Sequence, residues 1–155
     1  MTGAPAIELE AITPALWASV VGLEVEPQQR GFVAPVEHYL ELCDRPDSPW
    51  RPFAVMERGE VVGFVMHGVD PDDDSAWIGG LVIDRAHQRR GIGRTVVDLL
   101  VAHAASDDRA SALSYEPANT VAKALYERAG FVETGEREGD EVVARRPLTR
   151  SQRLR

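Results

Sequence analysis

Two glycines and three arginines lie between a predicted strand and a predicted helix. The strand is the apolar segment 77–83, and the loop after it holds Arg89, Arg90, Gly91, Gly93 and Arg94. The helix follows as TVVDLLVAHA, whose predicted buried face is Val96, Val97, Leu99, Leu100 and Ala104. Glycines let backbone N–H groups turn toward a ligand, and the start of a helix favours phosphate oxygens. The pattern predicts an anion-binding loop, with an ordinary tight turn as the alternative.

Two other nucleotide-binding loops are excluded by their spacing. A P-loop needs GxxxxGK followed by Ser or Thr, and a dinucleotide fold needs GxGxxG early in a βαβ unit; neither is present. Cys43 is the single cysteine, so no disulfide within the chain and no cysteine-based zinc site are expected. We interpret Cys43 as a packing residue and expect no metal.

The elements around the loop alternate between strand and helix patterns. Upstream, the expected elements are a strand at 7–12, a helix that begins at Thr13 and Pro14 and carries Leu16, Trp17, Val20 and Val21, a helix at 35–43, a hairpin of strands 53–56 and 61–66 that turns at 57–60, and an acidic loop at 70–74. Gly79 and Gly80 interrupt the strand at 77–83, which predicts a bulge or the close approach of a ligand or another backbone.

Composition limits the class of protein. A chain of 155 residues with 44% hydrophobic residues fits one domain, which we expect at 1–148 with a basic tail at 149–155. No segment is apolar enough to span a bilayer, and the first residues lack a signal peptide pattern, so we expect a cytoplasmic protein without a membrane partner.

Charge argues against nucleic acid as a partner. The whole chain carries −8, and because its last eleven residues hold five Arg and no acid, residues 1–144 carry −13. A field of this sign repels nucleic acid and attracts cations.

Two blocks of sequence resemble a known family. Residues 88–93, QRRGIG, match the Q/R-x-x-G-x-G/A signature of GNAT acetyltransferases. Downstream, LSYEPANTVAKALYERAGF resembles the strand and helix of that family in which an Asn and a Tyr flank the thiol of coenzyme A; here these are Asn119 and Tyr126. The resemblance covers about residues 50–148.

This resemblance implies a fold and a co-substrate. The fold is α/β (α+β), a mixed, mostly antiparallel sheet of six or seven strands flanked by about four helices and splayed near Leu81. Acetyl-CoA would lie in that opening, with the pyrophosphate on the glycine loop. The implied acetyl-CoA contacts are Leu81, Val82, Ile83, Gln88, Arg89, Arg90, Gly91, Ile92, Gly93, Arg94, Asn119, Lys123 and Tyr126.

The resemblance also assigns catalytic roles. Tyr126 is the candidate acid, because a phenol with a pKa of about 10 stays protonated at neutral pH and can donate to the departing thiolate. A backbone N–H near Leu81 would polarise the acetyl carbonyl. The general base is not identified: Trp77 stands where some relatives carry a glutamate, and Glu116, Glu37 and an ordered water remain open.

A narrower resemblance points to the acceptor. Three stretches within 23–148 resemble bacterial spermine/spermidine (diamine) acetyltransferases, which implies an amine substrate and a homodimer. The candidate substrate contacts are Glu24, Glu37, Glu41, Trp77 and Glu116. Glu37 and Glu41 are expected one turn apart on the same face of the helix at 35–43. Gly79 and Gly80 stand where bulkier residues are expected, which predicts a wider pocket, and Arg145 and Arg146 have no assigned role. A protein or peptide N-acetyltransferase and a non-catalytic CoA-binding sensor are the alternatives.

Overall fold

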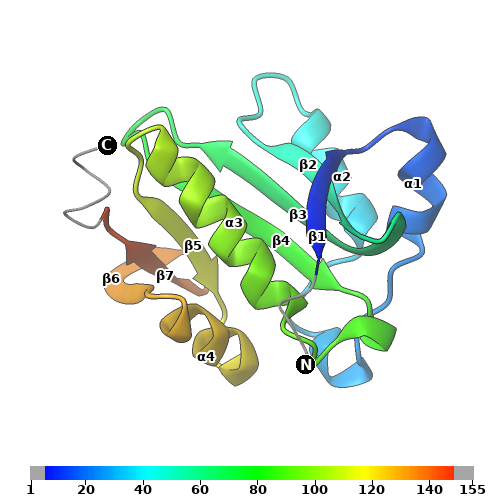
Figure 1. The fold of residues 1–155 in the computed structure, drawn as a ribbon. Helices are drawn as coiled ribbons and strands as arrows, with labels where there is room; N and C mark the ends of the chain where they lie inside the picture. The colour runs from blue at the N-terminus through cyan, green and yellow to red at the C-terminus, as the bar shows by residue number, and fades with distance from the viewer. Residues whose placement is uncertain (1–5, 149–155) are drawn as a thin grey trace.

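A computed structural model describes residues 6–148 and contains one seven-stranded sheet with the order β1-β2-β3-β4-β5-β7-β6 (Figure 1). In chain order, the elements are β1 (Ile7–Ala11), α1 (Pro14–Val21), the 3-10 turn η1 (Pro27–Gln29), α2 (Val36–Asp44), β2 (Arg51–Glu57), β3 (Glu60–Val69), β4 (Ala76–Ile83), the 3-10 turn η2 (Arg85–His87), α3 (Ile92–Ser106), β5 (Ser111–Tyr115), α4 (Thr120–Arg128), β6 (Val132–Glu138) and β7 (Glu141–Arg146).

The sheet separates two hydrophobic cores. One lies under α3 and α4, where Val96, Val97 and Leu100 pack on Val62 and Leu113. The other lies under α1 and α2 on the opposite face, where Val20 and Leu40 pack on Phe64. Burial of apolar side chains on both faces is what holds a central sheet between two helical layers.

The sheet opens between β4 and β5. These two strands form its one parallel pair, and they are in register at only two positions, Ala76 with Ser111 and Trp77 with Ala112. Beyond Trp77 the strands diverge, so the segment that contains Leu81 has no partner on the β5 side. The predicted mixed, mostly antiparallel sheet with four α-helices and a splay near Leu81 is therefore confirmed.

A bulge on β4 confirms the prediction from the glycine pair. Phe64 and Met66 of β3, two residues apart, pair with Val82 and Gly79 of β4, three residues apart, so β4 carries one extra residue. Gly80 lies in this bulge with a φ of +58°, in the left-handed region that favours glycine.

Thr13 occupies the N-cap of α1 with Pro14 after it, as expected for the start of this helix, and its hydroxyl makes no capping hydrogen bond. Two other local expectations needed correction. Leu99, predicted to be buried, is 41% exposed, because α3 packs on the core through a face that includes Val96, Val97, Leu100 and Val101. Strand β3 extends three residues past the predicted end, to Val69.

Within residues 6–148, no helix is long and apolar enough to cross a membrane, and no group of three or more His, Cys, Asp or Glu is arranged to hold a metal ion. Cys43 packs beside the core under α2, with its Sγ 3.9 Å from the Met66 sulfur. The predicted basic tail at 149–155 lies outside the described residues.

Candidate active site

A cavity of about 590 Å³ occupies the opening between β4 and β5. Its wall includes Tyr39 from α2 on one face of the sheet and Tyr126 from α4 on the other. The β4 segment with Gly80 and Leu81 lies between them. Because its lining comes from both helical layers, the cavity passes through the sheet at the splay, and two ligands could approach each other there from opposite faces.

Helix α4 presents three residues to this cavity. Asn119, Ala122 and Tyr126 follow one another at helical spacing, so they share one side of the helix. Asn119 is also the N-cap, and its Oδ1 accepts a hydrogen bond from the Ala122 N–H at 3.2 Å. The cap stabilises the first turn of α4, and Tyr126 lies further along the same helix.

Tyr126 lies among aromatic rings. Its ring centroid is 5.7 Å from that of Tyr115 and 6.2 Å from that of Phe131. Burial is the main cause that raises the pKa of Tyr126 to about 12, and the nearby Tyr39, Glu141 and Tyr115 add to it. The phenol is therefore fully protonated at neutral pH and can act as a donor.

The Leu81 amide lies at the bulge. Leu81 has no partner in the register between β3 and β4, and β5 has diverged on its other side. Its side chain packs against the same core cluster as Tyr126. A position outside both strand pairings is what the predicted role of its amide, polarising a carbonyl, requires.

Carboxylates are the only charged side chains in the cavity wall. Asp70, Glu116, Glu138 and Glu141 line it, and none of the Lys, Arg or His residues within 6–148 does. Glu141 accepts a hydrogen bond from the Ser114 hydroxyl at 2.7 Å. Aromatic side chains, including Trp50 and Trp77, make up much of the remaining wall.

The predicted substrate contacts fall in three places. Trp77 and Glu116 line the main cavity with Tyr126. Glu37 and Glu41 share one face of α2, as expected, but they line a separate cavity of about 830 Å³ between α1 and α2. Glu24 lines neither; its carboxylate lies 3.7 Å from Arg85 at the surface. Of the two glutamates considered as a base, only Glu116 lies in the wall that contains Tyr126.

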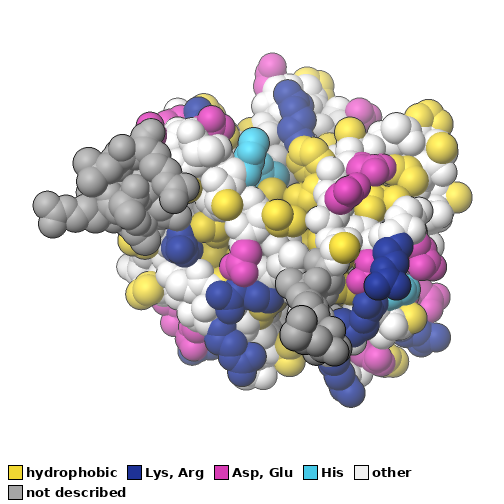
Figure 2. Space-filling view, viewed as in Figure 1, with side chains coloured by type: hydrophobic (Ala, Val, Ile, Leu, Met, Phe, Trp, Pro, Cys, Tyr) yellow, Lys and Arg dark blue, Asp and Glu magenta, His cyan; other side chains and the backbone are white. Residues whose placement is uncertain are grey.

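The glycine loop begins α3 as predicted. Gly91 is the N-cap residue with a φ of +79°, and no atom lies within 4 Å of where its Cβ would be. Backbone N–H groups in the first turn have no partner inside the helix, so they can bind an anion. Figure 2 shows Lys and Arg side chains on both sides of the grey atoms in the lower half of this face.

The three arginines of the loop differ in their partners. Arg90 donates to both carboxylate oxygens of Glu57, at 2.8 and 2.9 Å, and this pair lowers the pKa of Glu57. Arg94 pairs with Asp98 one turn along α3, at 3.0 Å. None of the ion pairs among residues 6–148 involves Arg89, which has a φ of +64°. Arg89 is thus the arginine with its charge uncompensated.

Other predicted coenzyme contacts are restricted by burial or by existing bonds. The side chains of Val82 and Ile92 are buried, so only their backbone can reach a ligand. Gln88 donates to Gln29 at 2.8 Å and to the Ile83 carbonyl at 2.9 Å, which braces the loop against η1 and β4. Lys123 lies 3.9 Å from Glu127 on the surface of α4.

The space left by the two glycines of β4 is filled. A Cβ on Gly79 would lie 2.9 Å from Met66 and 3.0 Å from Trp50, and one on Gly80 would lie 3.0 Å from the ring of Tyr39. Neighbouring side chains therefore take the place of the missing ones, and the two glycines leave no open space beside them. The glycines bring Trp50 and Tyr39 into the cavity wall.

Sequence reasoning missed Asp70, Glu138 and Glu141. The last two flank the Gly139–Asp140 turn of the β6–β7 hairpin, and the GD pair before alternating strand residues is the signal that could have located them. Asp70 was seen only as part of an acidic loop. Its position in the wall depends on how far β3 extends, which the sequence did not predict.

Comparison with known proteins gives the family. Residues 17–131 match the acetyltransferase (GNAT) family. The chain is 27% identical over 149 residues to the spermine/spermidine N(1)-acetyltransferase of Bacillus subtilis (strain 168), covering 90% of this chain and 97% of that protein.

Solved structures have the same fold. A chimera of the spermidine N-acetyltransferase SpeG from Vibrio cholerae and hSSAT superposes with a TM-score of 0.71 at 22% identity, over 96% of this chain and 98% of the other. RimL, a ribosomal L7/L12 alpha-N-protein acetyltransferase in complex with coenzyme A, does so with a TM-score of 0.66 at 16% identity, over 92% and 94%. The family match covers the glycine loop, Asn119 and Tyr126, and the protein is accordingly an acetyltransferase that belongs to the GNAT family.

Proposed function

We propose that this enzyme transfers the acetyl group of acetyl-CoA to a primary amine of a polyamine or diamine such as spermidine or spermine. One observation carries the proposal: within the described residues the cavity wall holds four carboxylates and no basic side chain. A polyamine is a flexible chain of ammonium groups, which carboxylates bind by charge and aromatic faces bind by cation–π attraction. The relative from Bacillus subtilis, named as a spermine/spermidine acetyltransferase, supports the same acceptor.

Acetyl-CoA fits the opposite side of the cavity. The N-terminal turn of α3, with Arg89 beside it, offers N–H groups and charge to the pyrophosphate. From there the diverged part of β4 leads to Leu81 and Tyr126. Bound acetyl-CoA supplies an activated thioester; Leu81 N–H would polarise its carbonyl oxygen and the Tyr126 hydroxyl would donate to the sulfur.

The amine must lose a proton before it attacks. An amine with a pKa near 10.4 is only about one part in a thousand neutral at physiological pH, and forming the free base costs about 4 kcal/mol. We assign the proton acceptor role to Glu141, directly or through a water. Glu141 lines the cavity, and its charge contributes to the raised pKa of both Tyr39 and Tyr126, the two phenols on opposite sides of the opening.

The acceptor is tested by measuring thiol release from acetyl-CoA with spermidine, spermine, short diamines, aminoglycosides and peptides, in the wild type and in Tyr126→Phe. We expect saturable turnover with polyamines and a loss of about 10²- to 10³-fold in kcat in the variant. Turnover with peptides alone would make this a protein-modifying enzyme. Binding of acetyl-CoA without thiol release for any amine would leave a CoA sensor.

The base is tested with Glu141→Gln and Glu116→Gln. We expect Glu141→Gln to lower kcat by about 10²-fold at pH 7.5. As the pH approaches the pKa of the amine, where no base is needed, kcat of the variant should return toward the wild-type value. Glu10→Gln, which removes an exposed carboxylate from the edge strand β1, is the control for loss of charge. A pH-dependent defect in Glu116→Gln instead would move the role to that residue.

The proposal includes action in the cytoplasm as a homodimer, as the sequence and the family resemblance suggest. Light scattering on the purified protein should give twice the mass of one chain. A single-chain mass at working concentration would contradict the dimer and leave the reaction unaffected.

A further inference from the structure

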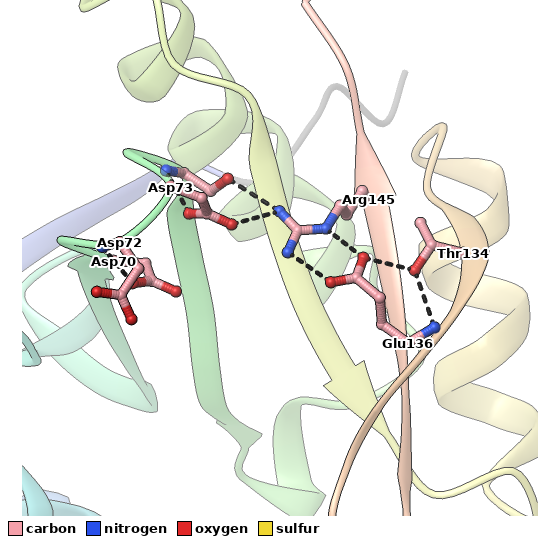
Figure 3. A network of polar contacts seen from close by, with 7 residues as sticks. Asp70, Asp72, Asp73, Thr134, Glu136 and Arg145 are labelled. Atoms are coloured by element: carbon pink, nitrogen blue, oxygen red, sulfur yellow. Dashed lines mark hydrogen bonds and ion pairs between the residues drawn. The ribbon is translucent and has the colours of Figure 1, made fainter.

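Arg145 of β7, for which the sequence indicated no role, links the loop between β3 and β4 to strand β6 (Figure 3). Its Nη1 donates to the Ser75 hydroxyl at 2.9 Å and lies 3.0 Å from an Asp73 carboxylate oxygen. Its Nε and Nη2 donate to the two carboxylate oxygens of Glu136, at 2.7 and 3.0 Å. The guanidinium therefore bridges the loop between β3 and β4 and strand β6 with both of its edges.

The same side chain covers a wall residue of the cavity. The Arg145 guanidinium carbon lies 5.5 Å from the ring centroid of Trp77. The Trp77 indole N–H is shielded from solvent and has no acceptor among residues 6–148. Since no hydrogen bond to a described residue orients the indole, the Arg145 guanidinium over its ring is a contact that can hold the ring against the wall.

The loop that Arg145 holds is crowded with like charges. Residues 70–74 contain four aspartates, and Asp70 also accepts a hydrogen bond from the Asp72 N–H at 2.8 Å. Their mutual repulsion favours a more open loop. Arg145 compensates the charge of Asp73, and Arg109 compensates that of Asp74 at 3.2 Å. Hydrogen bonds from Ser75 and Arg145 lower the pKa of Asp73, so its carboxylate stays charged and paired.

The position of this loop matters for the cavity. Asp70 and Pro71 line the cavity, and Asp73 and Ser75 at the other end of the loop bind Arg145. The Asp70 N–H donates to the Ser75 carbonyl at 2.9 Å, so the two ends of the loop are also tied to each other. A shift of Ser75 would be transmitted to Asp70 through that bond.

We propose that Arg145 is a positioning residue for the amine acceptor, because it holds both the Asp70 carboxylate and the Trp77 ring in the wall against which the acceptor binds. This inference rests on the proposed function. Arg145 acts through these two residues and takes no part in the chemistry. Its loss should weaken the binding of the amine and leave acetyl-CoA and the reacting groups at Tyr126 unaffected.

The experiment is steady-state kinetics of Arg145→Gln with spermidine as acceptor. We expect KM for spermidine to rise about tenfold, with kcat within about twofold of wild type and KM for acetyl-CoA unchanged. Arg145→Lys keeps the charge but cannot form the two-edged bridge, so it should recover only part of the defect. Arg137→Gln removes a charge from the same hairpin and should behave as wild type, because among the described residues Arg137 bonds only the Asp140 carbonyl.

A second variant tests whether Arg145 acts through Asp73. Asp73→Asn breaks the same link from the loop side, and it should raise KM for spermidine by a similar factor. If both act through one contact, the double variant should be no worse than either single variant. A folded Arg145→Gln enzyme with an unchanged KM for spermidine, or one in which both KM values rise together, would overturn the proposal.

Hydrogen exchange separates this inference from the proposed function. The Ser75 and Asp74 amides, which bond to Asp73 and Asp70, should exchange faster in Arg145→Gln than in the wild type. Failure of the wild type to acetylate any polyamine would sink the proposed function, and the exchange rates would still report whether Arg145 holds the loop. Unchanged exchange would contradict the positioning role whatever the acceptor is.

Discussion

The surroundings of Tyr126 all raise the pKa of its phenol. Burial disfavours the phenolate, and the charges of Glu141 and the neighbouring tyrosines disfavour it further, which raises its pKa to about 12. A weak acid is a poor proton source for a thiolate with a pKa near 8.5 in water. The same burial also disfavours the thiolate, so proton donation is matched to the leaving group inside the cavity and not in bulk solvent.

This pKa predicts how Tyr126 titrates. The difference in absorbance at 295 nm between wild type and Tyr126→Phe should show no phenolate below about pH 11, because the folded pKa lies above the unfolded value of about 10. The neutral phenol then favours the folded state, a contribution that is complete below pH 10 and declines as pH rises toward 12. A difference titration with its midpoint near pH 10 would contradict the buried position.

The geometry of strand β4 at the cavity depends on a residue whose backbone departs from regular strand conformation. Gly80 combines a φ of +58° with a close approach of Tyr39, and both come from the extra residue in β4. The glycine pair in an apolar strand was sufficient to predict this bulge, because glycine inside a strand weakens it unless the geometry requires it.

Substituting Gly80 tests that dependence. Gly80→Ala adds a Cβ at 3.0 Å from the Tyr39 ring as well as backbone strain, so we expect about 2–3 kcal/mol loss in the free energy of unfolding, measured with urea. Gly59→Ala in the β2–β3 turn has a φ of +79° with no atom within 4 Å, so it should cost only the strain of about 1 kcal/mol. Equal losses in the two variants would mean that Tyr39 moves aside without cost.

The order of the helices and strands and the glycine loop at the start of α3 could be predicted because each depends on patterns within a short stretch of chain. Asn119 and Tyr126 came from the family resemblance; both line the cavity, and their roles stay predictions. Prediction from the sequence failed where the answer depends on distant segments. Glu37 and Glu41 were correctly assigned to one face of α2, yet that face borders a second cavity. The three acids of the main cavity that were missed lie directly after β3, at the end of β6 and at the start of β7, segments that meet only when the sheet is assembled.

At the scale of the whole molecule, the net charge of the protein and the charge of the cavity wall have the same sign. Residues 1–144 carry a net charge of −13, and four of their carboxylates line the cavity wall where the acceptor would bind. Arg89, Arg90 and Arg94 lie in the glycine loop and the first turn of α3, and Figure 2 shows Lys and Arg side chains at several places in the lower half of this face. The molecule is thus polarised, with an acidic wall for a cationic acceptor and a basic loop for an anionic co-substrate.

Such a distribution predicts a strong salt dependence for one substrate. Between 20 mM and 500 mM NaCl, kcat/KM for spermidine should fall by about tenfold, because screening weakens the attraction of a polyvalent cation most. A monoamine of similar length should lose about twofold or less, since it carries one charge to be attracted, and kcat should change little for either. Sodium sulfate at matched ionic strength serves as a check that chloride itself does not inhibit. Equal losses for the two amines would mean that the acidic wall does not bind the distal ammonium groups, and that the acceptor is held by its reacting end alone.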